Sequence, residues 1–468
     1  MSTKTWRNKV TSQHWCILAV FLFLGLHLGY INTPFVNLEW VYRQGAQFFL
    51  TGDIIALEHY FNNQANPLTY SYLVSLLVRS SGIDQFAIYR LPALFGGTLL
   101  LLVLVRYRNP WLVLVVALNP LIWIYSGRAY SELLAVGLML VAYEMQRHRA
   151  VGGFVGVLSG AVKYHTFPIL LLNAGLNWLS LIWKNGFRFW NNHYFRSIAI
   201  VLAGFLIFLL IYQKLFDVWI VPSRYKSILE PSILDWTNNF FSYGFYLASM
   251  FFLTIPYLLL NTHWRWQVAV IMISIPLAIM NQNKGEMDFG SFNQLLGEDI
   301  ILLIKIIGFW NFLLCCKIFW NDDKSRILIL TVLLYMALLS MTRPAQRYLI
   351  FIIPFWAIMI CLRLEIHRVV QVGYVLIFCG LNLFTTLYQV QNARASAEIA
   401  AWSQSKDIKI NSAEIFPHVG IFSHHDPKSK ITVTMNPKPN DKILFSRAVK
   451  ILNYPLREYF VVQPIDAS

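Results

Sequence analysis

The chain has 468 residues, enough for two or three soluble domains, but hydrophobic residues make up 57% of it and charged residues only 13%. That charge is too little to cover the water-exposed surface of a chain of this length, so a soluble protein is excluded and an integral membrane protein is expected. The formal net charge of +15 is then assigned to loops that face anionic lipid, and no nucleic-acid partner is predicted.

The first apolar stretch, 16–31, follows a basic start and has the outline of a signal peptide. No small-residue cleavage site follows it, so a retained first helix with a cytoplasmic N-terminus is expected. With roughly 20 residues per span, the sequence predicts about thirteen membrane spans, near 16–31, 85–105, 110–126, 131–146, 151–163, 165–183, 197–213, 242–260, 266–280, 299–316, 326–341, 347–362 and 369–388. The segment 67–79 is a further, half-embedded helix in this interpretation.

Positive charge sets the predicted orientation. With the N-terminus inside, every connector that falls in the cytoplasm carries Lys or Arg, as cytoplasmic loops of membrane proteins do. The predicted location is the inner (plasma) membrane of the cell, and the compact chain, with no extended loops of the eukaryotic kind, favours a bacterial one. An odd number of spans places the C-terminus outside. The expected domains are a transmembrane domain, 1–390, whose first outward loop is 32–66, and a small mixed α/β extracytoplasmic domain, 391–468, with one strand at 430–435.

The outward loops and turns hold the residues that suggest chemistry. Glu39 follows the first span by a few residues, where partial desolvation would suit a carboxylate to take a proton from an acceptor hydroxyl. The alternative is an interfacial ion pair with Arg43, four residues on. Arg128 and Glu132, at the second outward turn, have the same spacing and the same alternative, a local pair that ends two helices.

Two more outward turns carry cations. Lys163 and His165 lie between two spans with almost no loop, where a lysine can also simply reach the interface. Arg343 and Arg347 flank a proline before a late span, and paired guanidinium groups suit the oxygens of a phosphate, although interfacial anchors have the same composition. Acids and bases at four outward turns of one chain predict a common site, because unrelated structural pairs would scatter over both faces.

Together these segments resemble the polyprenyl-phosphate-sugar-dependent glycosyltransferases of the GT-C superfamily, in the branch of the protein O-mannosyltransferases and the lipid A aminoarabinose transferase. The resemblance rests on Glu39 after the first span, followed by Tyr42, Ala46 and Gly52-Asp53, and on five further segments: HYFNNQANPLTYSYL (59–73), IYRLPALFGG (88–97), NPLIWIYSGRAYSELL (119–134), GAVKYHTFPIL (160–170) and RPAQRYLIFIIPFW (343–356). The segment 190–320 matches nothing specific.

The resemblance implies a GT-C-like, all-α polytopic fold and an inverting transfer of a monosaccharide from a polyprenyl-phosphate carrier to an extracytoplasmic lipid, glycan or protein acceptor. It implies Glu39 as the catalytic base. For the departing phosphate of the donor it implies four cations, Arg128, Lys163, Arg343 and Arg347. It implies Glu132 to orient one of these cations or a sugar hydroxyl, and it places the neighbouring His165 and Tyr348 on the donor side as well. On the acceptor side it implies Asp53, His59 and Tyr60.

Several alternatives remain open at the level of sequence. The base is Asp53, Glu58, Asp217 or Asp235 if it is not Glu39. No cofactor is predicted. A divalent metal is not supported, because Asn37 and Leu38 precede Glu39 where members of the family often carry paired acids, and one carboxylate with few neighbouring oxygens is a poor site for such an ion. A transporter or flippase for lipid-linked sugars is the rival from another class and would need charge near the bilayer midplane, for which Lys305 is the best candidate. A polymerase or ligase of lipid-linked oligosaccharides is the third reading.

Overall fold

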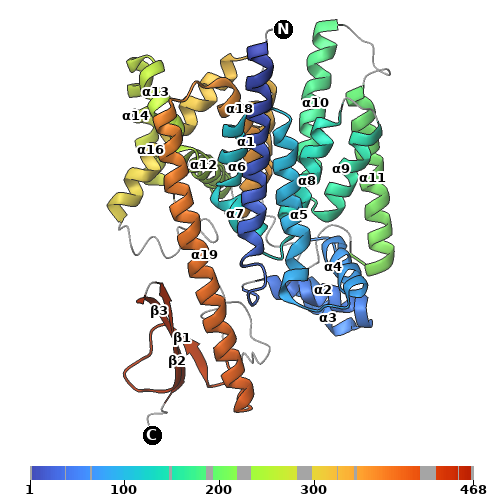
Figure 1. Ribbon diagram of the computed structural model, residues 1–468, viewed down its shortest axis with the longest axis vertical. Coiled ribbons are helices and arrows are strands. Elements are labelled where there is room, and N and C mark those ends of the chain that lie inside the picture. Colours follow the sequence, from blue (N-terminus) through green and yellow to red (C-terminus); the bar gives the residue numbers. More distant parts are fainter. Residues whose placement is uncertain are drawn as a thin grey trace.

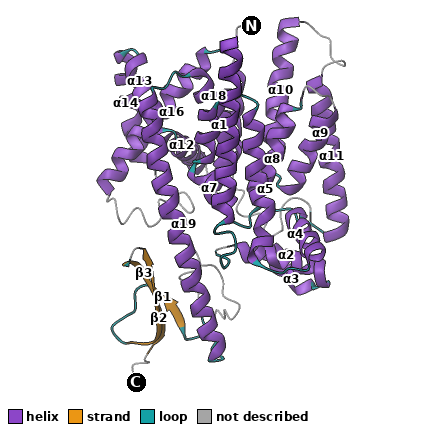
Figure 2. Ribbon diagram, viewed as in Figure 1, coloured by secondary structure: helices purple, strands orange, loops and turns teal. Residues whose placement is uncertain are grey.

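The computed structural model describes residues 3–36, 38–63, 66–146, 150–185, 193–218, 233–281, 298–323, 325–341, 345–411, 428–451 and 453–464. This part of the chain is mostly helical, with a small three-stranded sheet near the C-terminus (Figure 2). The prediction that the main body is helical is confirmed, and so is the prediction that the tail combines helix with strand.

The first half of the chain contains helices of widely different length. In order they are α1 (Thr3–Leu28), α2 (Glu39–Thr51), α3 (Ile54–Asn63), α4 (Thr69–Ser81), α5 (Phe86–Val105), α6 (Pro110–Ala117), α7 (Pro120–Ser126), α8 (Ser131–Glu144), α9 (Ala150–Val162), α10 (Thr166–Asn185) and α11 (His193–Phe216). The predicted first outward loop therefore holds two helices, α2 and α3, and the predicted half-embedded segment is α4. Figure 1 shows α2, α3 and α4 together at the lower end of the bundle.

The second half continues with helices and ends in strands. In order they are α12 (Ile233–Met250), η3 (Phe252–Thr254), α13 (Ile255–Asn261), α14 (Trp264–Met280), α16 (Glu298–Asn321), α17 (Arg326–Ser340), η4 (Gln346–Phe351), α18 (Ile353–Arg363), α19 (Arg368–Ser405), β1 (Thr432–Thr434), β2 (Asp441–Ile451) and β3 (Tyr454–Pro464).

Each of the predicted apolar spans coincides with helix, but three of them are broken. The span 110–126 is two short helices, because the Asn119 side chain accepts a hydrogen bond from the Leu121 N–H and Pro120 starts a new helix. The span 242–260 bends by 69° between Asp235–Met250 and Phe252–Asn261. The span 347–362 begins as the 3-10 helix η4.

By length and composition, five of the described helices are able to cross a membrane, or six if the bent pair counts as one span. Their surfaces agree with this, since α11 exposes a row of leucines, Leu202, Leu206 and Leu210. Such a row is unfavourable in water and favourable in lipid. A membrane protein is therefore compatible with the fold, while the thirteen spans and the GT-C-like arrangement stay predictions.

Two glycines let α5 and α8 pack at close range. A Cβ atom on Gly96 would lie 2.3 Å from backbone atoms of Leu134, and one on Gly137 would lie 2.4 Å from the Gly96 carbonyl oxygen. Only glycine allows two helices to approach this closely. This contact sets α5 firmly against α8.

The C-terminal strands pack on an extension of α19. The sheet has the order β1-β3-β2 with antiparallel pairing, and a tight turn at Asn453, whose φ is +68°, joins β2 to β3. The predicted strand at 430–435 is confirmed as β1, whereas β2 and β3 were not predicted. The proposed boundary at 390 falls inside α19, which runs unbroken from the bundle to the sheet (Figure 1).

Candidate functional site

Three charged side chains from distant parts of the chain meet at one place. Nζ of Lys163 lies 2.6 Å from Oε1 of Glu132, and both side chains are almost fully buried. Nε of Arg347 lies 3.8 Å from the same carboxylate oxygen, with a side chain that is 16% exposed. The start of α8, the turn after α9 and the 3-10 helix η4 supply these three residues. Three of the residues predicted from the sequence to form one site therefore lie together, whereas the side of the membrane that they face stays a prediction.

An aromatic pair flanks the charges. The rings of His165 and Tyr348 stack with centroids 4.3 Å apart. Nζ of Lys163 lies 5.7 Å from the centre of the Tyr348 ring, and the guanidinium carbon of Arg347 lies 5.5 Å from it. Both cations are within the range in which an aromatic ring attracts positive charge. The structure thus brings His165 and Tyr348 to the same cluster as Glu132, Lys163 and Arg347.

A tyrosine of the first loop also reaches the start of α8. The hydroxyl of Tyr42, on α2, lies 3.1 Å from Oγ of Ser131 and accepts a hydrogen bond from Nδ2 of Asn66. Tyr42 is fully buried. This contact adds a fourth segment to the site and brings the first-loop helices next to Glu132.

Arg128 lies in the turn that leads into α8. Its positive charge acts on the buried hydroxyls of Tyr125 and Tyr130, and so does the charge of Arg347. Both guanidinium groups are therefore within electrostatic range of these two tyrosines. Arg343, the remaining predicted cation, is outside the described residues.

Three buried polar atoms of this cluster have no hydrogen-bond partner within the described chain: Arg128 Nε, Glu132 Oε2 and His165 Nδ1. A buried polar atom without a partner costs about 1–3 kcal/mol, so such atoms are rare in folded proteins. Their gathering around one set of charges leaves donors and an acceptor that a polar ligand or ordered water could satisfy. We define the charge cluster as Arg128, Glu132, Lys163, His165, Arg347 and Tyr348.

Burial lowers the pKa of the His165 imidazole well below its usual range, and the charges of Lys163 and Arg347 lower it further. The ring is therefore neutral at neutral pH. A neutral ring has one nitrogen that donates and one that accepts. His165 is thus a hydrogen-bonding group of the cluster and not one of its charges.

Glu39 is fully buried, and its partner is a residue that sequence reasoning did not assign. Nε and Nη2 of Arg90 lie 2.7 and 2.8 Å from its two carboxylate oxygens. The predicted alternative, a pair with Arg43, is wrong, because Arg43 pairs with Asp84 at the surface. The local pair of Arg128 with Glu132 is likewise replaced by the pair of Glu132 with Lys163. The only sequence signal for Arg90 was its place in the Arg-Leu-Pro segment.

The predicted acceptor residues lie on or near α3 and serve local structure. Asp53 is exposed, and its Oδ1 accepts hydrogen bonds from the N–H groups of Ile55 and Ala56 at the start of this helix. His59 is exposed. Tyr60 is fully buried, and its hydroxyl donates to the carbonyl oxygens of residues 66 and 67. A role of these residues toward an acceptor stays a prediction.

The alternative residues are dispersed. Glu58 is exposed on α3, and the Asp217 carboxylate accepts from Gln213 at the end of α11. Asp235 is in the first turn of α12. The Lys305 ammonium donates to the carbonyl oxygen of Asn281 at 2.8 Å. None of these side chains has a described contact with the charge cluster.

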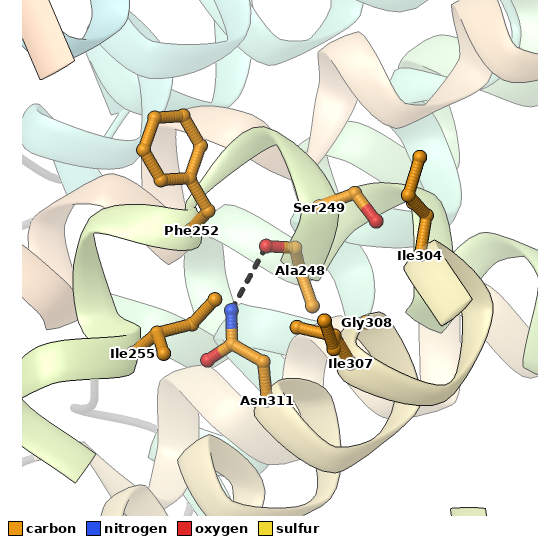
Figure 3. A pocket seen from close by; sticks show the side chains of 8 residues that line it. All are labelled: Ala248, Ser249, Phe252, Ile255, Ile304, Ile307, Gly308 and Asn311. Carbon is orange, nitrogen blue, oxygen red and sulfur yellow. Dashed lines mark hydrogen bonds between the residues drawn. The ribbon is translucent and has the colours of Figure 1, made fainter. Parts of the chain in front are cut away.

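A separate cavity of about 230 Å³ lies between α12, η3, α13 and α16. Its lining is mainly apolar, and Figure 3 shows Asn311 at its edge, with the amide bonded to the Ala248 carbonyl oxygen. No residue of the charge cluster lines it. Among the described residues, no three His, Cys, Asp or Glu side chains are grouped so that they could hold a metal ion.

Comparison of the chain with protein-family models, with curated proteins and with solved structures found no match in any of the three.

Proposed function

We propose that the chain is an inverting glycosyltransferase of the plasma membrane that moves a monosaccharide from a polyprenyl-phosphate carrier to an extracytoplasmic acceptor. The observation that carries the proposal is the charge cluster. It combines three cations with one carboxylate, and it retains buried donors and acceptors without partners in the described chain. An anionic head group with sugar hydroxyls would satisfy both kinds of atom.

The chemistry of the reaction matches this distribution of charge. Breaking the bond between the anomeric carbon and the phosphate oxygen places negative charge on the departing phosphate and positive charge on the sugar. Fixed cations beside that phosphate stabilise the transition state more than the ground state, which is how binding accelerates a reaction. Arg128 and Arg347 are assigned to the phosphate, because a planar guanidinium binds two oxygens at once.

The remaining members of the charge cluster have supporting roles. Lys163 adds positive charge and holds the Glu132 carboxylate at 2.6 Å. The second oxygen of Glu132 and Nδ1 of His165 are assigned to hydroxyl groups of the sugar, since both are buried without partners in the described chain. The exposed apolar faces of the long helices would let the hydrocarbon tail of the donor stay in lipid.

A direct assay tests the proposal. The purified full chain is placed in lipid vesicles with a polyprenyl-phosphate sugar, and release of polyprenyl phosphate is measured together with the anomeric configuration of the product. Arg347→Gln should raise the KM for the donor by about 10- to 100-fold, because hydrogen bonds to charged groups contribute about 1.5–3 kcal/mol. Arg326→Gln is the matched control, since Arg326 forms a surface pair with Asp323.

Two outcomes would contradict the proposal. One is a donor KM that is the same in the wild type and in Arg347→Gln. The other is the absence of turnover together with the absence of binding of polyprenyl phosphate to the wild-type chain. Movement of intact lipid-linked sugar across the vesicle, without release of phosphate, would instead support the transporter.

A further inference from the structure

The carboxylate of Glu39 accepts four hydrogen bonds. Oε1 accepts from Nε of Arg90 at 2.7 Å and from the N–H of Ala129 at 2.7 Å. Oε2 accepts from Nη2 of Arg90 at 2.8 Å and from the N–H of Val36 at 2.9 Å. The side chain is completely buried. An ionised carboxylate has about four acceptor positions, and all of them are occupied.

Arg90 extends this contact to the segment before α2. Its Nη1 donates to the carbonyl oxygens of Ile31 and Thr33, and its Nη2 donates to that of Pro34. The guanidinium thus holds an irregular stretch of backbone against the start of α5. Because that stretch lacks the internal hydrogen bonds of a helix, Arg90 and Glu39 together supply the partners that its backbone needs.

The bond to Ala129 links this arrangement to the charge cluster. Ala129 is fully buried and directly follows Arg128 in the turn that leads to Glu132. The N–H of Ala129 points to Glu39 Oε1, which fixes the rotation of the turn. The direction in which Arg128 leaves the backbone is then set by Glu39, which lies 90 positions before Ala129 in the sequence.

We propose that Glu39 is a positioning residue and not the base of the reaction: with Arg90 it holds the turn 127–131 so that Arg128 faces the phosphate of the donor and Glu132 faces its sugar. The proposal rests on the function proposed above. A general base must be within hydrogen-bond reach of the proton it takes and must have an acceptor position free for it. Glu39 has its four positions filled, two of them by the Arg90 guanidinium.

Hydrogen exchange tests the positioning without any assay of activity. Exchange is measured by mass spectrometry on peptides that cover residues 127–131 and on peptides that cover Val36, in the full chain in detergent, for the wild type, Glu39→Ala and Glu39→Gln. Loss of a hydrogen bond to a charged acceptor should speed exchange of the Ala129 amide by about 10- to 100-fold in Glu39→Ala. Arg43→Gln is the matched control, because it removes an exposed pair from the same helix.

Glu39→Gln keeps the shape of the side chain and covers the case in which Glu39→Ala does not fold. The amide presents one accepting oxygen and one donating NH₂ group to a site that offers only donors. One of the two backbone amides, that of Val36 or that of Ala129, should therefore exchange faster in this variant. Unchanged exchange at both amides in every folded variant would overturn the proposal.

The pH profile of the reaction separates a positioning residue from a base. Glu39→Gln should raise the KM for the donor and keep the acidic limb of the kcat/KM profile. Arg90→Lys should have the same effect, because a lysine cannot donate to both carboxylate oxygens as a guanidinium does. If Glu39 is the base, Glu39→Gln should instead lower kcat by about 100- to 10,000-fold and abolish that limb.

The two proposals fail in distinguishable ways. If no sugar transfer is found but exchange at residue 129 rises in the Glu39 variants, the transferase fails and the positioning of the turn stands. If transfer is found and the acidic limb disappears in Glu39→Gln, the transferase stands and the positioning role is wrong. In that case Glu39 would release one of its four partners during the reaction.

Discussion

Lys163 and Glu132 are 31 residues apart in the chain, yet their side chains meet at 2.6 Å with no more than 2% of either exposed. Two charges that are removed from water in this way stabilise a fold only if each compensates the other. The pair therefore joins the start of α8 to the end of α9 and also holds the carboxylate that Arg347 approaches.

Breaking this pair from one side should be strongly destabilising. Lys163→Met or Glu132→Gln alone leaves one buried charge uncompensated and should lower the free energy of unfolding by about 3–5 kcal/mol. The double variant should lose less than the sum of the two single variants, as measured by thermal unfolding in detergent. Additive losses would show that the two side chains do not depend on each other in solution.

Stability should decrease at acidic pH because of His165. Burial, with the charges of Lys163 and Arg347, lowers the pKa of this imidazole well below its usual range in the folded chain. The unfolded chain therefore binds one proton more than the folded chain below about pH 6.5, so that stability falls as the pH falls. His165→Asn should show a smaller loss of melting temperature between pH 7 and pH 5. The same slope in both proteins would contradict the assignment.

His27 should stabilise the contact between α1 and α7. Its Nδ1 lies 2.8 Å from the carbonyl oxygen of Phe23, and its Nε2 lies 2.9 Å from that of Trp123. Trp123 is among the last four residues of α7, whose carbonyl oxygens have no partner within their own helix. His27→Phe keeps a ring but removes both contacts, and should cost about 1–3 kcal/mol of unfolding free energy. His59→Phe, at an exposed position, is the control and should change the melting temperature little.

A buried hydrogen bond connects the sheet to α19. The hydroxyl of Tyr459, on β3, donates to Oδ1 of Asn392 at 2.6 Å. Tyr459→Phe removes this hydrogen bond and should destabilise the packing of the sheet on α19 by about 1–3 kcal/mol. Limited proteolysis of the strands should become faster, whereas cleavage within the bundle should not change. Equal protection of the strands in both proteins would mean that apolar packing holds the sheet on α19 without this hydrogen bond.

The sequence was informative where the apolar pattern alone determines structure. Runs of apolar residues located the helices, because a segment in lipid must satisfy its backbone internally and does so as a helix. The grouping of Glu132, Lys163 and Arg347 followed from placing short turns on one face. It needed no knowledge of side-chain geometry, since helix ends on one face of a bundle lie near one another.

The partners of individual side chains were not predictable in the same way. Spacing of four residues suggested Arg43 for Glu39 and Arg128 for Glu132, but the buried partners are Arg90 and Lys163. Local spacing describes neighbours on one helix, whereas these pairs join different helices. The break at Asn119 was missed because the turn there lies inside a long apolar stretch. The strands β2 and β3 were missed because the turns around them lie inside a long polar stretch.

The continuous course of α19 has a mechanical consequence. A helix of 38 residues is roughly 57 Å long at 1.5 Å per residue, nearly twice the thickness of the hydrocarbon layer of a bilayer. If its apolar start spans the lipid, about half of its length extends beyond the hydrocarbon layer as a rigid helix. The sheet at its far end is then held at a set height above the surface, where it could meet only molecules that extend that far from the membrane.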